Sequence, residues 1–314
     1  MGLDKLGRIG ILMGGPSSER EISLKSGRAV YDALSKLGIS ALEIDIKTDD
    51  VEEAKSLIKS SAIDCAFIAL HGRFGEDGQI QQILENLNIV YTGSDAFASR
   101  IAMDKAISRE FFVINGLDAP FYKVIEGPDF NNNFDWLADF KFPIVIKPAG
   151  QGSSVGLSIV DNKQLVGKAV SLAFSFDEKI IIEEYLSGRE VTVGILDEKP
   201  LPVIEIIPKN RFFDYQAKYQ PGMSDYIVPA KMEEKITALL QEKALLAHKI
   251  LGCFGCSRVD IILKPDNTAV ILEVNTIPGL TQTSLLPKAA KIIGIDFARL
   301  CIKLIELAYE KAQV

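Results

Sequence analysis

The chain has 314 residues, of which 47% are hydrophobic and 25% charged, and this length allows about two domains or three small ones. Such a composition is ordinary for globular proteins, and it excludes an intrinsically disordered, collagen-like or low-complexity chain. The net charge of −7 makes a nucleic-acid partner unexpected, because an acidic surface repels phosphate backbones.

In residues 1–93, short apolar runs alternate with helical patterns. Repeated βα units of this kind favour a parallel sheet covered by helices, and ligands of such sheets bind at the carboxyl ends of the strands. Segments 14–19 and 71–78 lie at two such ends, so binding residues are expected in both. The predicted strands are 8–13, 41–46, 65–70 and 89–91, and the predicted helices are 22–37, 51–59 and 79–87.

A domain boundary is predicted near residues 92–95, followed by helical patterns as far as residue 116 and a loop at 131–133. The expected fold class is mixed α/β and α+β, with domains at 1–93, 94–182 and 183–314, the last of which closes with helices. The further predicted elements are strands at 142–147, 158–160, 179–185, 189–196 and 201–207 and a helix at 162–174.

Residues 208–230 show no clean periodicity, yet they contain aromatic, basic and turn residues. Structureless loops longer than about 12–15 residues inside a compact enzyme are usually functional lids or disordered segments. The aromatic side chains of Phe212, Tyr215 and Tyr219 argue against disorder. The segment is therefore predicted to be a lid over a binding site.

Two strand-like runs, 257–262 and 270–275, are joined by a turn around Asp266-Asn267 and predict a β-hairpin. If the hairpin is symmetric about that turn, Asp260 lies directly opposite Glu273. The polar face of the hairpin then carries Arg258, Asp260, Glu273 and Asn275. The other face, which is predicted to enter the core, carries Ile261, Leu272 and Val274.

Two carboxylates placed opposite each other repel, so the pair of Asp260 and Glu273 needs compensation. A hard divalent cation supplies it, with oxygen ligands from Asp260, Glu273 and Asn275. A water-exposed polar face neutralised by Arg258 is the alternative. The chain has two histidines, which excludes a histidine-rich metal centre, so the expected cation is Mg²⁺, Mn²⁺ or Ca²⁺.

The segment KPAGQGSSVG at 147–156 ends a predicted strand with Lys147 and continues as a glycine-rich loop. Such a loop lets backbone N–H groups approach phosphate oxygens while the lysine supplies a point charge; a glycine-rich turn without a ligand is the alternative. It is not a Walker A loop, and the chain has neither the HRD and DFG motifs of protein kinases nor a GxGxxG fingerprint. Together with the oxygen-ligand site, the loop favours a nucleotide enzyme that uses Mg²⁺.

Along essentially its whole length, the chain resembles the D-alanine–D-alanine ligases of the ATP-grasp superfamily. Each matching segment alone is modest, but all of them in this order are specific. The resemblance implies an ATP-grasp fold with an N-terminal parallel-sheet (pre-ATP-grasp) domain. The matching segments are GGPSSEREIS at 14–23, HGRFGEDG at 71–78, AMDK at 102–105, KPAGQGSSVG at 147–156, DYQAKY at 214–219, RVD at 258–260, EVNTIPG at 273–279 and TQTSLLP at 281–287.

The resemblance implies that ATP binds between the central and C-terminal domains. It also implies two Mg²⁺ or Mn²⁺ ions at Asp260, Glu273 and Asn275, with Glu273 as the bridging ligand. Many relatives carry lysine and tryptophan at the positions of Glu184 and Tyr185, which leaves the nucleotide affinity open. The implied ATP-binding residues are Lys105, Lys147, Ser153, Ser154, Glu183, Glu184, Tyr185, Leu186, Glu190, Phe212, Lys218 and Asn275.

By the same resemblance, ATP phosphorylates the carboxylate of a first D-alanine, and the amine of a second D-alanine attacks the resulting acyl phosphate. Arg258 and the Gly279 N–H would stabilise the oxyanion of that attack. Tyr219, Ser153 and Glu19 would form a hydrogen-bonded link that closes the lid. The implied catalytic residues are Glu19, Ser153, Tyr219, Arg258 and Gly279. The implied substrate-binding residues are Glu19 for the first ammonium, Ser284 for the second carboxylate, and His71, Arg258, Gly279 and Leu285.

Plainer explanations exist for three of the polar side chains. Glu19, early in a predicted helix, also favours the helix dipole, and His71 is also explained by a hydrogen bond to a strand-end carbonyl. His248 lies on a predicted helix and is expected to be structural.

Three functions are left to separate: a D-alanine–D-alanine ligase, a relative that accepts D-lactate or another amino acid at the second site, and a nucleotide-binding protein without ligase chemistry. Tyr219 favours an amine acceptor, as the resemblance has it, and the intact Arg258, Asp260, Glu273 and Asn275 argue against the third. A homodimer is expected from the resemblance. Cytoplasmic residence is expected because no apolar run approaches the roughly 20 residues of a membrane span.

Overall fold

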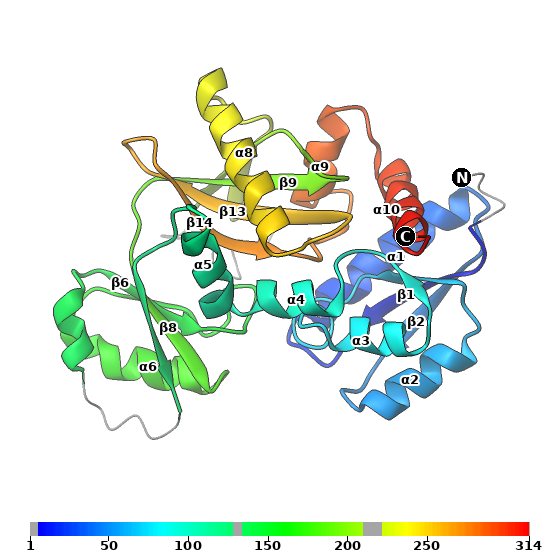
Figure 1. Ribbon diagram of the computed structural model, residues 1–314, viewed down its shortest axis with the longest axis horizontal. Coiled ribbons are helices and arrows are strands. Elements are labelled where there is room, and N and C mark those ends of the chain that lie inside the picture. Colours follow the sequence, from blue (N-terminus) through cyan, green and yellow to red (C-terminus); the bar gives the residue numbers. More distant parts are fainter. Residues whose placement is uncertain (1–5, 128–133, 210–221, 314) are drawn as a thin grey trace.

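The computed structural model describes residues 6–127, 134–209 and 222–313, which form three β-sheets with helices packed against them (Figure 1). One sheet is parallel and the other two are antiparallel. The expected mixture of α/β and α+β structure is therefore confirmed.

The N-terminal unit is a parallel sheet, as predicted, and its strand order is β2-β1-β3-β4. Every residue of its two central strands is buried, because helices cover both faces of the sheet. The carboxyl ends of these strands lead to Glu19 and His71. The strands are β1 (Ile9–Gly14), β2 (Ala41–Ile46), β3 (Cys65–Ile68) and β4 (Val90–Tyr91), and the helices are α1 (Arg20–Lys36), α2 (Val51–Ser60) and α3 (Gln79–Asn86).

Helices α4 (Ala96–Met103) and α5 (Lys105–Ile114) lead into a four-stranded antiparallel sheet with the order β5-β8-β6-β7. The sequence pattern does not predict β5, an edge strand in which no residue is buried. The predicted helix at 162–174 starts later, because residues 163–165 form a 3₁₀ turn, and the predicted loop at 131–133 lies outside the described residues. The elements are β5 (Tyr122–Glu126), η2 (Asp135–Asp139), β6 (Ile144–Pro148), β7 (Ser158–Val160), η3 (Lys163–Leu165), α6 (Val166–Phe174) and β8 (Lys179–Glu184).

The third sheet has six antiparallel strands in the order β12-β11-β9-β13-β14, with β10 paired to β9. Strand β12 lies within 208–230, so the expectation of a structureless segment is wrong for residues 224–227, which pair with β11. Residues 210–221 of the predicted lid lie outside the described residues. The elements are β9 (Arg189–Leu196), β10 (Lys199–Pro200), β11 (Ile204–Pro208), β12 (Ser224–Ile227), α8 (Glu234–Ile250), β13 (Cys256–Leu263), β14 (Ala269–Asn275), α9 (Leu285–Ile292) and α10 (Phe297–Lys311).

The hairpin of β13 and β14 has the predicted register at its polar end. Asp260 pairs with Glu273, and Arg258 pairs with Asn275. Beyond Asp260 the register shifts by one residue, so Ile261 pairs with Ile271. The prediction that Leu272 enters the core is therefore wrong, because the bulge turns it toward a cavity and Ile271 takes the core position.

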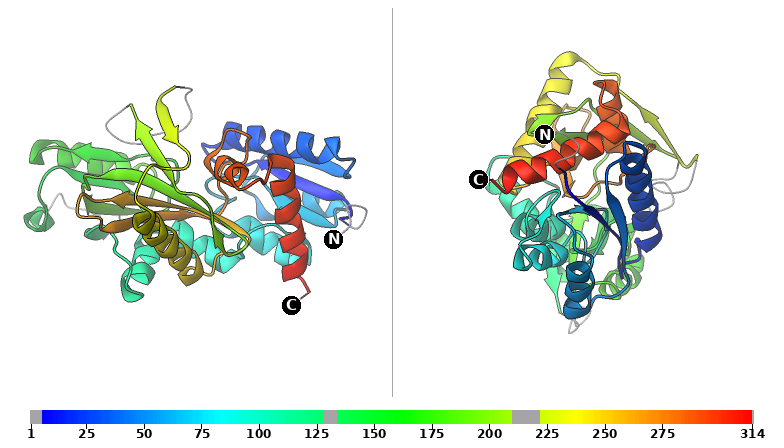
Figure 2. Two further views of the ribbon diagram at one scale, coloured as in Figure 1. Left: turned by 90° about the horizontal axis from the view of Figure 1, so that it is seen from above. Right: turned by 90° about the vertical axis from the view of Figure 1, so that its right-hand side faces the viewer.

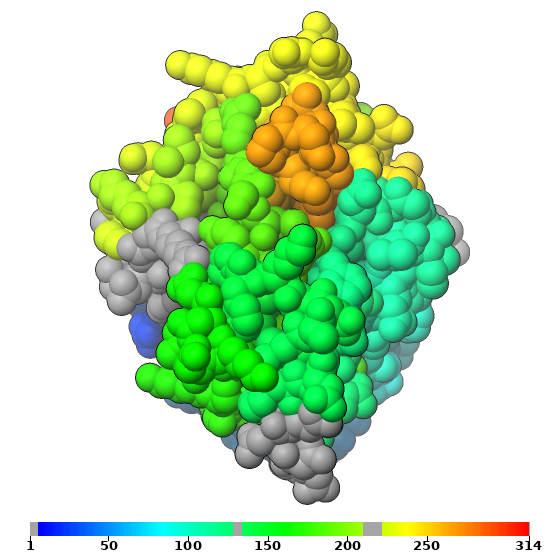
Figure 3. Space-filling model, turned by 90° about the vertical axis from the view of Figure 1, so that its left-hand side faces the viewer, coloured from blue at the N-terminus to red at the C-terminus, as the bar shows by residue number. Residues whose placement is uncertain are grey.

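Helices from the end of the chain pack back on its beginning (Figure 2). Helix α10 contacts α1 and β4, and one hydrophobic core joins the N-terminal sheet to α9 and α10. Helices α4 and α5 pack instead with α8 and β14 around a second core. Figure 3 shows that the green residues of the four-stranded sheet and the orange tip of the β13–β14 hairpin reach the same face of the molecule. The three sheets are thus held around one central region.

Among the described residues, no helix combines the length and the apolar composition that crossing a membrane requires.

Candidate active site

Two adjacent cavities lie where the three units meet. The first, of about 350 Å³, is lined by the loops after β1 and β3, by β13 and β14, and by the start of α9. The second, of about 570 Å³, lies between the four-stranded and the six-stranded sheet. Lys105 and Glu273 line both cavities, so ligands in the two cavities can meet beside these side chains.

Glu19 stands at the start of α1 and points into the first cavity, where its side chain is almost fully buried. The hydroxyl of Ser153, from the glycine-rich loop, donates a hydrogen bond to the Glu19 carboxylate. Ser153 and Ser154 have φ angles of 52° and 59°, a left-handed conformation that is strained for residues with a side chain. The loop is therefore held in an uncommon conformation that brings Ser153 to the N-terminal unit.

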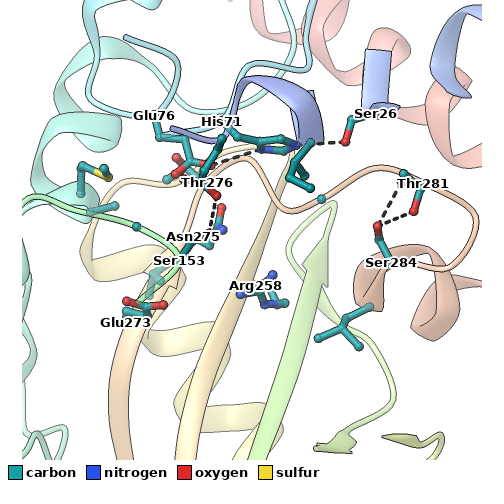
Figure 4. A pocket seen from close by; sticks show the side chains of 18 of the residues that line it. Ser26, His71, Glu76, Ser153, Arg258, Glu273, Asn275, Thr276, Thr281 and Ser284 are labelled. Atoms are coloured by element: carbon teal, nitrogen blue, oxygen red, sulfur yellow. Dashed lines mark hydrogen bonds and ion pairs between the residues drawn. The ribbon is translucent and has the colours of Figure 1, made fainter. Parts of the chain in front are cut away.

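His71 and two residues that the sequence analysis did not single out, Ser26 and Glu76, form a buried polar group in the wall of the first cavity (Figure 4). Nε2 of His71 lies 3.0 Å from Oγ of Ser26, and Nδ1 lies 3.4 Å from Oε1 of Glu76. Burial raises the pKa of Glu76; the hydrogen bond from His71 opposes this, and the Glu19 carboxylate adds to it. The position of Glu76 within the HGRFGEDG segment is the signal that could have identified it.

Arg258 and Asp260 alternate along β13 and are joined to each other. The Arg258 guanidinium donates two hydrogen bonds to the Asp260 carboxylate, at 2.9 and 2.8 Å. Oγ1 of Thr192, on the neighbouring strand β9, donates a third bond of 2.6 Å to Oδ1 of Asp260. Arg258 lines the first cavity and Asp260 the second, so this pair connects the two.

Glu273 and Asn275 follow on the paired strand β14. Oε2 of Glu273 lies 3.4 Å from Nζ of Lys105, and that ammonium also donates a 2.7 Å hydrogen bond to the carbonyl of Gln151. Oδ1 of Asn275 accepts a 2.9 Å bond from the N–H of Ile277. The repulsion expected between Asp260 and Glu273 is thus offset by one protein cation on each.

The residues on this face have the donor chemistry of a magnesium site. Asp260 and Glu273 supply carboxylate oxygens from directly paired positions, and Asn275 supplies an amide oxygen. No group of three or more His, Cys, Asp or Glu side chains in the described residues is arranged to hold a metal ion. A cation here would therefore need the Asn275 amide and further oxygens from a ligand such as a phosphate.

The N-terminus of α9 faces the first cavity. Ser284 precedes the helix, but its hydroxyl does not cap the first turn. Oγ of Ser284 lies instead 3.1 Å from the backbone N of Thr281 and 2.8 Å from Oγ1 of Thr281. The first N–H groups of a helix attract anions, so this end suits a carboxylate. Gly279 packs against Ser284, since an added Cβ would lie 3.2 Å from its hydroxyl. Leu285 begins the helix and also lines the cavity.

The second cavity contains a buried ionic cluster. Nζ of Lys147 lies 2.8 Å from Oε1 of Glu183, and Arg109 forms an ion pair with Oε2 of the same carboxylate. Burial lowers the pKa of Lys147 to about 8, partly opposed by Glu183. Burial alone would raise the pKa of Glu183, but Arg109 and Lys147 outweigh it and lower that pKa. Arg109 is a site residue that the sequence analysis missed.

The structure brings most of the site residues expected from the sequence to one of the two cavities. The first cavity is lined by Glu19, His71, Lys105, Ser153, Arg258, Glu273, Asn275, Gly279, Ser284 and Leu285. The second is lined by Lys105, Lys147, Ser154, Glu183, Glu184, Tyr185, Leu186, Glu190, Asp260 and Glu273. Phe212, Lys218 and Tyr219 lie outside the described residues.

His248 lies apart from both cavities. Its Nδ1 is 2.7 Å from Oγ of Ser257, and burial lowers its pKa to about 4. A neutral histidine packed between α8 and β13 is consistent with the structural role predicted for it.

Comparison with protein families and curated proteins gives one consistent result. The family model described as the D-ala D-ala ligase C-terminus matches residues 112–306, and the model of the N-terminus matches residues 46–94. The D-alanine–D-alanine ligase of Methylacidiphilum infernorum is 45% identical over 301 residues, covering 96% of this chain and 95% of the relative. That of Syntrophotalea carbinolica is 42% identical over 293 residues, covering 93% of each.

Solved structures agree with the sequence relatives. The D-alanine–D-alanine ligase of Bacillus anthracis complexed with ATP superposes with a TM-score of 0.85 at 33% identity, over 98% of this chain and 99% of that one. The VanG D-Ala:D-Ser ligase of Enterococcus faecalis gives a TM-score of 0.83 at 31% identity, over 96% and 99%. The ATP-grasp fold with an N-terminal parallel-sheet domain, expected from the sequence, is confirmed by these likenesses.

Proposed function

This chain belongs to the D-alanine–D-alanine ligase family, and on that basis we propose that it joins two D-alanine molecules to D-alanyl-D-alanine while ATP becomes ADP and phosphate. The observation that carries this proposal is that Lys105 and Glu273 line both cavities. A nucleotide in the larger cavity would extend its terminal phosphate toward a small substrate in the smaller one. Phosphoryl transfer from ATP to a carboxylate needs this arrangement.

The ATP site is the second cavity, between a central domain (94–182) and a C-terminal domain (183–314), with 1–93 as the substrate domain. Lys105 and Lys147 contact the phosphates, and the Ser153-Ser154 loop covers them. The base and ribose lie along the segment that joins the two domains. The residues assigned to base and ribose are Glu183, Glu184, Tyr185, Leu186 and Glu190. The family resemblance adds Phe212 and Lys218, which lie outside the described residues.

Asp260, Glu273 and Asn275 would hold the two Mg²⁺ or Mn²⁺ ions that the family resemblance implies. Bound metal would neutralise the charge that develops on the transferred phosphoryl group. Arg258 pairs with Asp260 and Lys105 pairs with Glu273, so a bound metal ion would compete with these two side chains for the carboxylates. Arg258 and Lys105 also line the first cavity, where they would interact with negative charge on the substrates.

The first D-alanine lies with its ammonium on Glu19 and its carboxylate toward Lys105 and Glu273. A carboxylate oxygen attacks the terminal phosphorus of ATP, ADP leaves, and an acyl phosphate forms. Ser153 is hydrogen-bonded to Glu19, and a continuation of this link to Tyr219 would close the site against water, which would otherwise hydrolyse this intermediate. His71 forms part of the wall of this subsite, and its contacts with Ser26 and Glu76 fix its position.

The second D-alanine lies with its carboxylate on Ser284, beside Leu285 at the N-terminus of α9. Its amine, once deprotonated, attacks the acyl carbon and the phosphate leaves. Arg258 and the N–H of Gly279 stabilise the oxyanion of the tetrahedral intermediate. Since a solved ligase named for D-serine shares the fold, the fold alone does not select the acceptor.

A product assay tests this proposal. The enzyme is incubated with ATP, Mg²⁺ and D-alanine, and in parallel with added D-lactate over a pH series, with L-alanine as the control substrate. Mass spectrometry should detect D-alanyl-D-alanine together with stoichiometric ADP. ATP consumption without dipeptide would reject the D-alanine acceptor, and a depsipeptide as the main product would favour a D-alanine–D-lactate ligase.

We further propose that the product serves peptidoglycan precursor synthesis in the cytoplasm and that the enzyme is a homodimer. Both proposals, on the use of the product and on the dimer, rest on the assignment of the chain to this family. Light scattering on the purified protein tests the dimer, since a mass of one chain at micromolar concentration would contradict it.

A further inference from the structure

Arg109, on α5, is fully buried and is the largest side chain with so little exposure. Its guanidinium forms an ion pair with Glu183 and lies 5.3 Å from the centre of the Tyr122 ring. Within the described parts of the chain, its Nε and Nη1 have no hydrogen-bond partner. An arginine buried in this way is costly for folding, so its presence calls for a reason beyond stability.

Glu183 has a cation on each carboxylate oxygen, and the two cations lie in different places. Oε1 is 2.8 Å from Nζ of Lys147, while Oε2 pairs with Arg109. Lys147 and Glu183 line the second cavity, whereas Arg109 does not. Arg109 thus holds the carboxylate from within the protein, and Lys147 holds it at the cavity wall.

The two cations also differ in their freedom. A guanidinium stays charged at any pH a protein tolerates, and the Arg109 side chain is enclosed between Glu183 and Tyr122. Lys147 is a flexible amine at the edge of a cavity, with a pKa lowered to about 8 by burial. Lys147 can move to a phosphate oxygen when a nucleotide binds, but Arg109 cannot leave Glu183.

We propose that Arg109 is a positioning residue that selects the nucleobase: it fixes the ionised Glu183 carboxylate so that it accepts a hydrogen bond from the exocyclic amino group of adenine. The proposal rests on the ATP site described under the proposed function. When Lys147 turns to the phosphates, Oε1 of Glu183 is released for that amino group. An ionised carboxylate only accepts hydrogen bonds, so a purine with a carbonyl oxygen at this position is repelled.

Loss of Arg109 has a defined consequence in this arrangement. Once Lys147 has moved to the phosphates, Glu183 is a buried carboxylate without a counter-ion, and such a group takes up a proton. A protonated carboxyl donates a hydrogen bond, so it accommodates a carbonyl oxygen as well as an amino group. The preference of the enzyme for purines with an amino group over purines with a carbonyl oxygen at this position should then be lost.

The test compares ATP with inosine triphosphate, in which a carbonyl oxygen replaces the amino group of adenine. Dipeptide formation gives kcat and KM for both nucleotides in the wild type, Arg109→Met, Arg109→Lys and the control Phe112→Leu. Phe112 is fully buried on the same helix but lines neither cavity. Arg109→Met should lower the ratio of kcat/KM for ATP over inosine triphosphate by more than about tenfold, chiefly through a lower KM for inosine triphosphate. Arg109→Lys should restore most of the ratio, and Phe112→Leu should leave it unchanged.

An unchanged ratio in folded Arg109→Met overturns the proposal, and so does an equal loss in Phe112→Leu, which would indicate a general effect of destabilising α5. If Arg109→Met does not fold, Glu183→Gln carries the test. Its amide can donate to a carbonyl oxygen, so the ratio should fall, and an unchanged ratio again overturns the proposal. Calorimetric binding of both nucleotides without D-alanine separates this inference from the proposed function. An Arg109-dependent preference for ATP in a protein that makes no dipeptide would refute ligase activity and support the inference.

Discussion

The lowered pKa of Lys147 predicts that ATP binding becomes coupled to proton uptake at alkaline pH. Its amine, between Glu183 and the cavity, has a pKa of about 8 against an ordinary 10.5, first because it is buried and also because Arg109 and Lys105 repel its charge. This lowering corresponds to about 3 kcal/mol of lost preference for the charged form. Phosphate oxygens favour the ammonium, so nucleotide binding raises this pKa again.

The sign and the size of the effect follow from that pKa. At pH 7 the amine is already charged, so binding takes up almost no proton through this group. At pH 9 about nine tenths of the free protein carries a neutral amine, and binding should then take up about 0.9 proton and be about tenfold weaker than at pH 7. Lys147→Arg should bind with little change between pH 7 and pH 9, because a guanidinium stays charged.

Isothermal titration calorimetry with a non-hydrolysable ATP analogue, in buffers of different ionisation enthalpy, measures this uptake directly. Measurements at pH 8 and above avoid the titration of the nucleotide's terminal phosphate. Lys147→Met, which has no titrating amine, is the control and should show weak binding without the extra proton. Absence of proton uptake by the wild type at pH 9, or a parallel loss of affinity in Lys147→Arg, would refute the reasoning.

Three further outcomes are expected. Glu273→Gln should lower turnover by more than about tenfold at low Mg²⁺, and turnover should recover partly as the Mg²⁺ concentration is raised. A normal rate at low Mg²⁺ in a steady-state assay would contradict the metal assignment. Ser153→Ala loses the hydrogen bond to Glu19 and should raise KM for the first D-alanine by about three- to tenfold, with an unchanged melting temperature. A kinetic titration of D-alanine that shows no change in KM would contradict a role for this hydrogen bond. Ile261→Ala should lower the free energy of unfolding by about 2–5 kcal/mol in urea titrations, because Ile261 is fully buried in the core beneath the site, whereas a loss below about 1 kcal/mol would mean that this core repacks.

The pairing of Asp260 with Glu273 could be predicted because a hairpin is a local structure. Side chains alternate with a period of two residues, and the turn places the two strands within one residue of the predicted register. The bulge offsets that one residue, so Asp260 faces Glu273 as predicted. The displacement of Leu272 could not be predicted, because a bulge inserts one residue without any mark in the hydrophobic pattern. The predicted register is therefore right on the turn-distal side of the bulge, where the polar residues lie. It is wrong by one residue between the bulge and the turn, where Ile261 pairs with Ile271.

Contacts between distant parts of the chain could be predicted only where the family resemblance indicates them. Glu19 and Ser153 are 134 positions apart, and only the family resemblance could bring them together before the structure did. Arg109 has no such support, because an arginine in a helical pattern usually indicates a solvent-exposed position. Arg109 pairs with Glu183 on strand β8, which is distant in the sequence, so no local pattern could indicate its burial. Ser26 was missed for the same reason, since it is 45 positions from His71. Glu76 is only five positions from His71, so the HGRFGEDG segment could have identified it.

The carboxylates of the proposed nucleotide site share one electrostatic arrangement. Asp260 pairs with Arg258, Glu273 with Lys105, and Glu183 with Arg109 and Lys147. An isolated buried charge would destabilise the fold strongly. The ion pairs allow these carboxylates to be buried even when no ligand is bound.

The same pairs would suit the metal–nucleotide complex proposed above, since a divalent cation is attracted to the carboxylates and phosphates are attracted to Arg258, Lys105 and Lys147. Binding would then exchange one set of ion pairs for another and would leave no charge buried alone. Arg109 is the exception, because it lines neither cavity and keeps its carboxylate throughout. That exception is why the purine base, and not the phosphates, is the part of the nucleotide that Arg109 is expected to select.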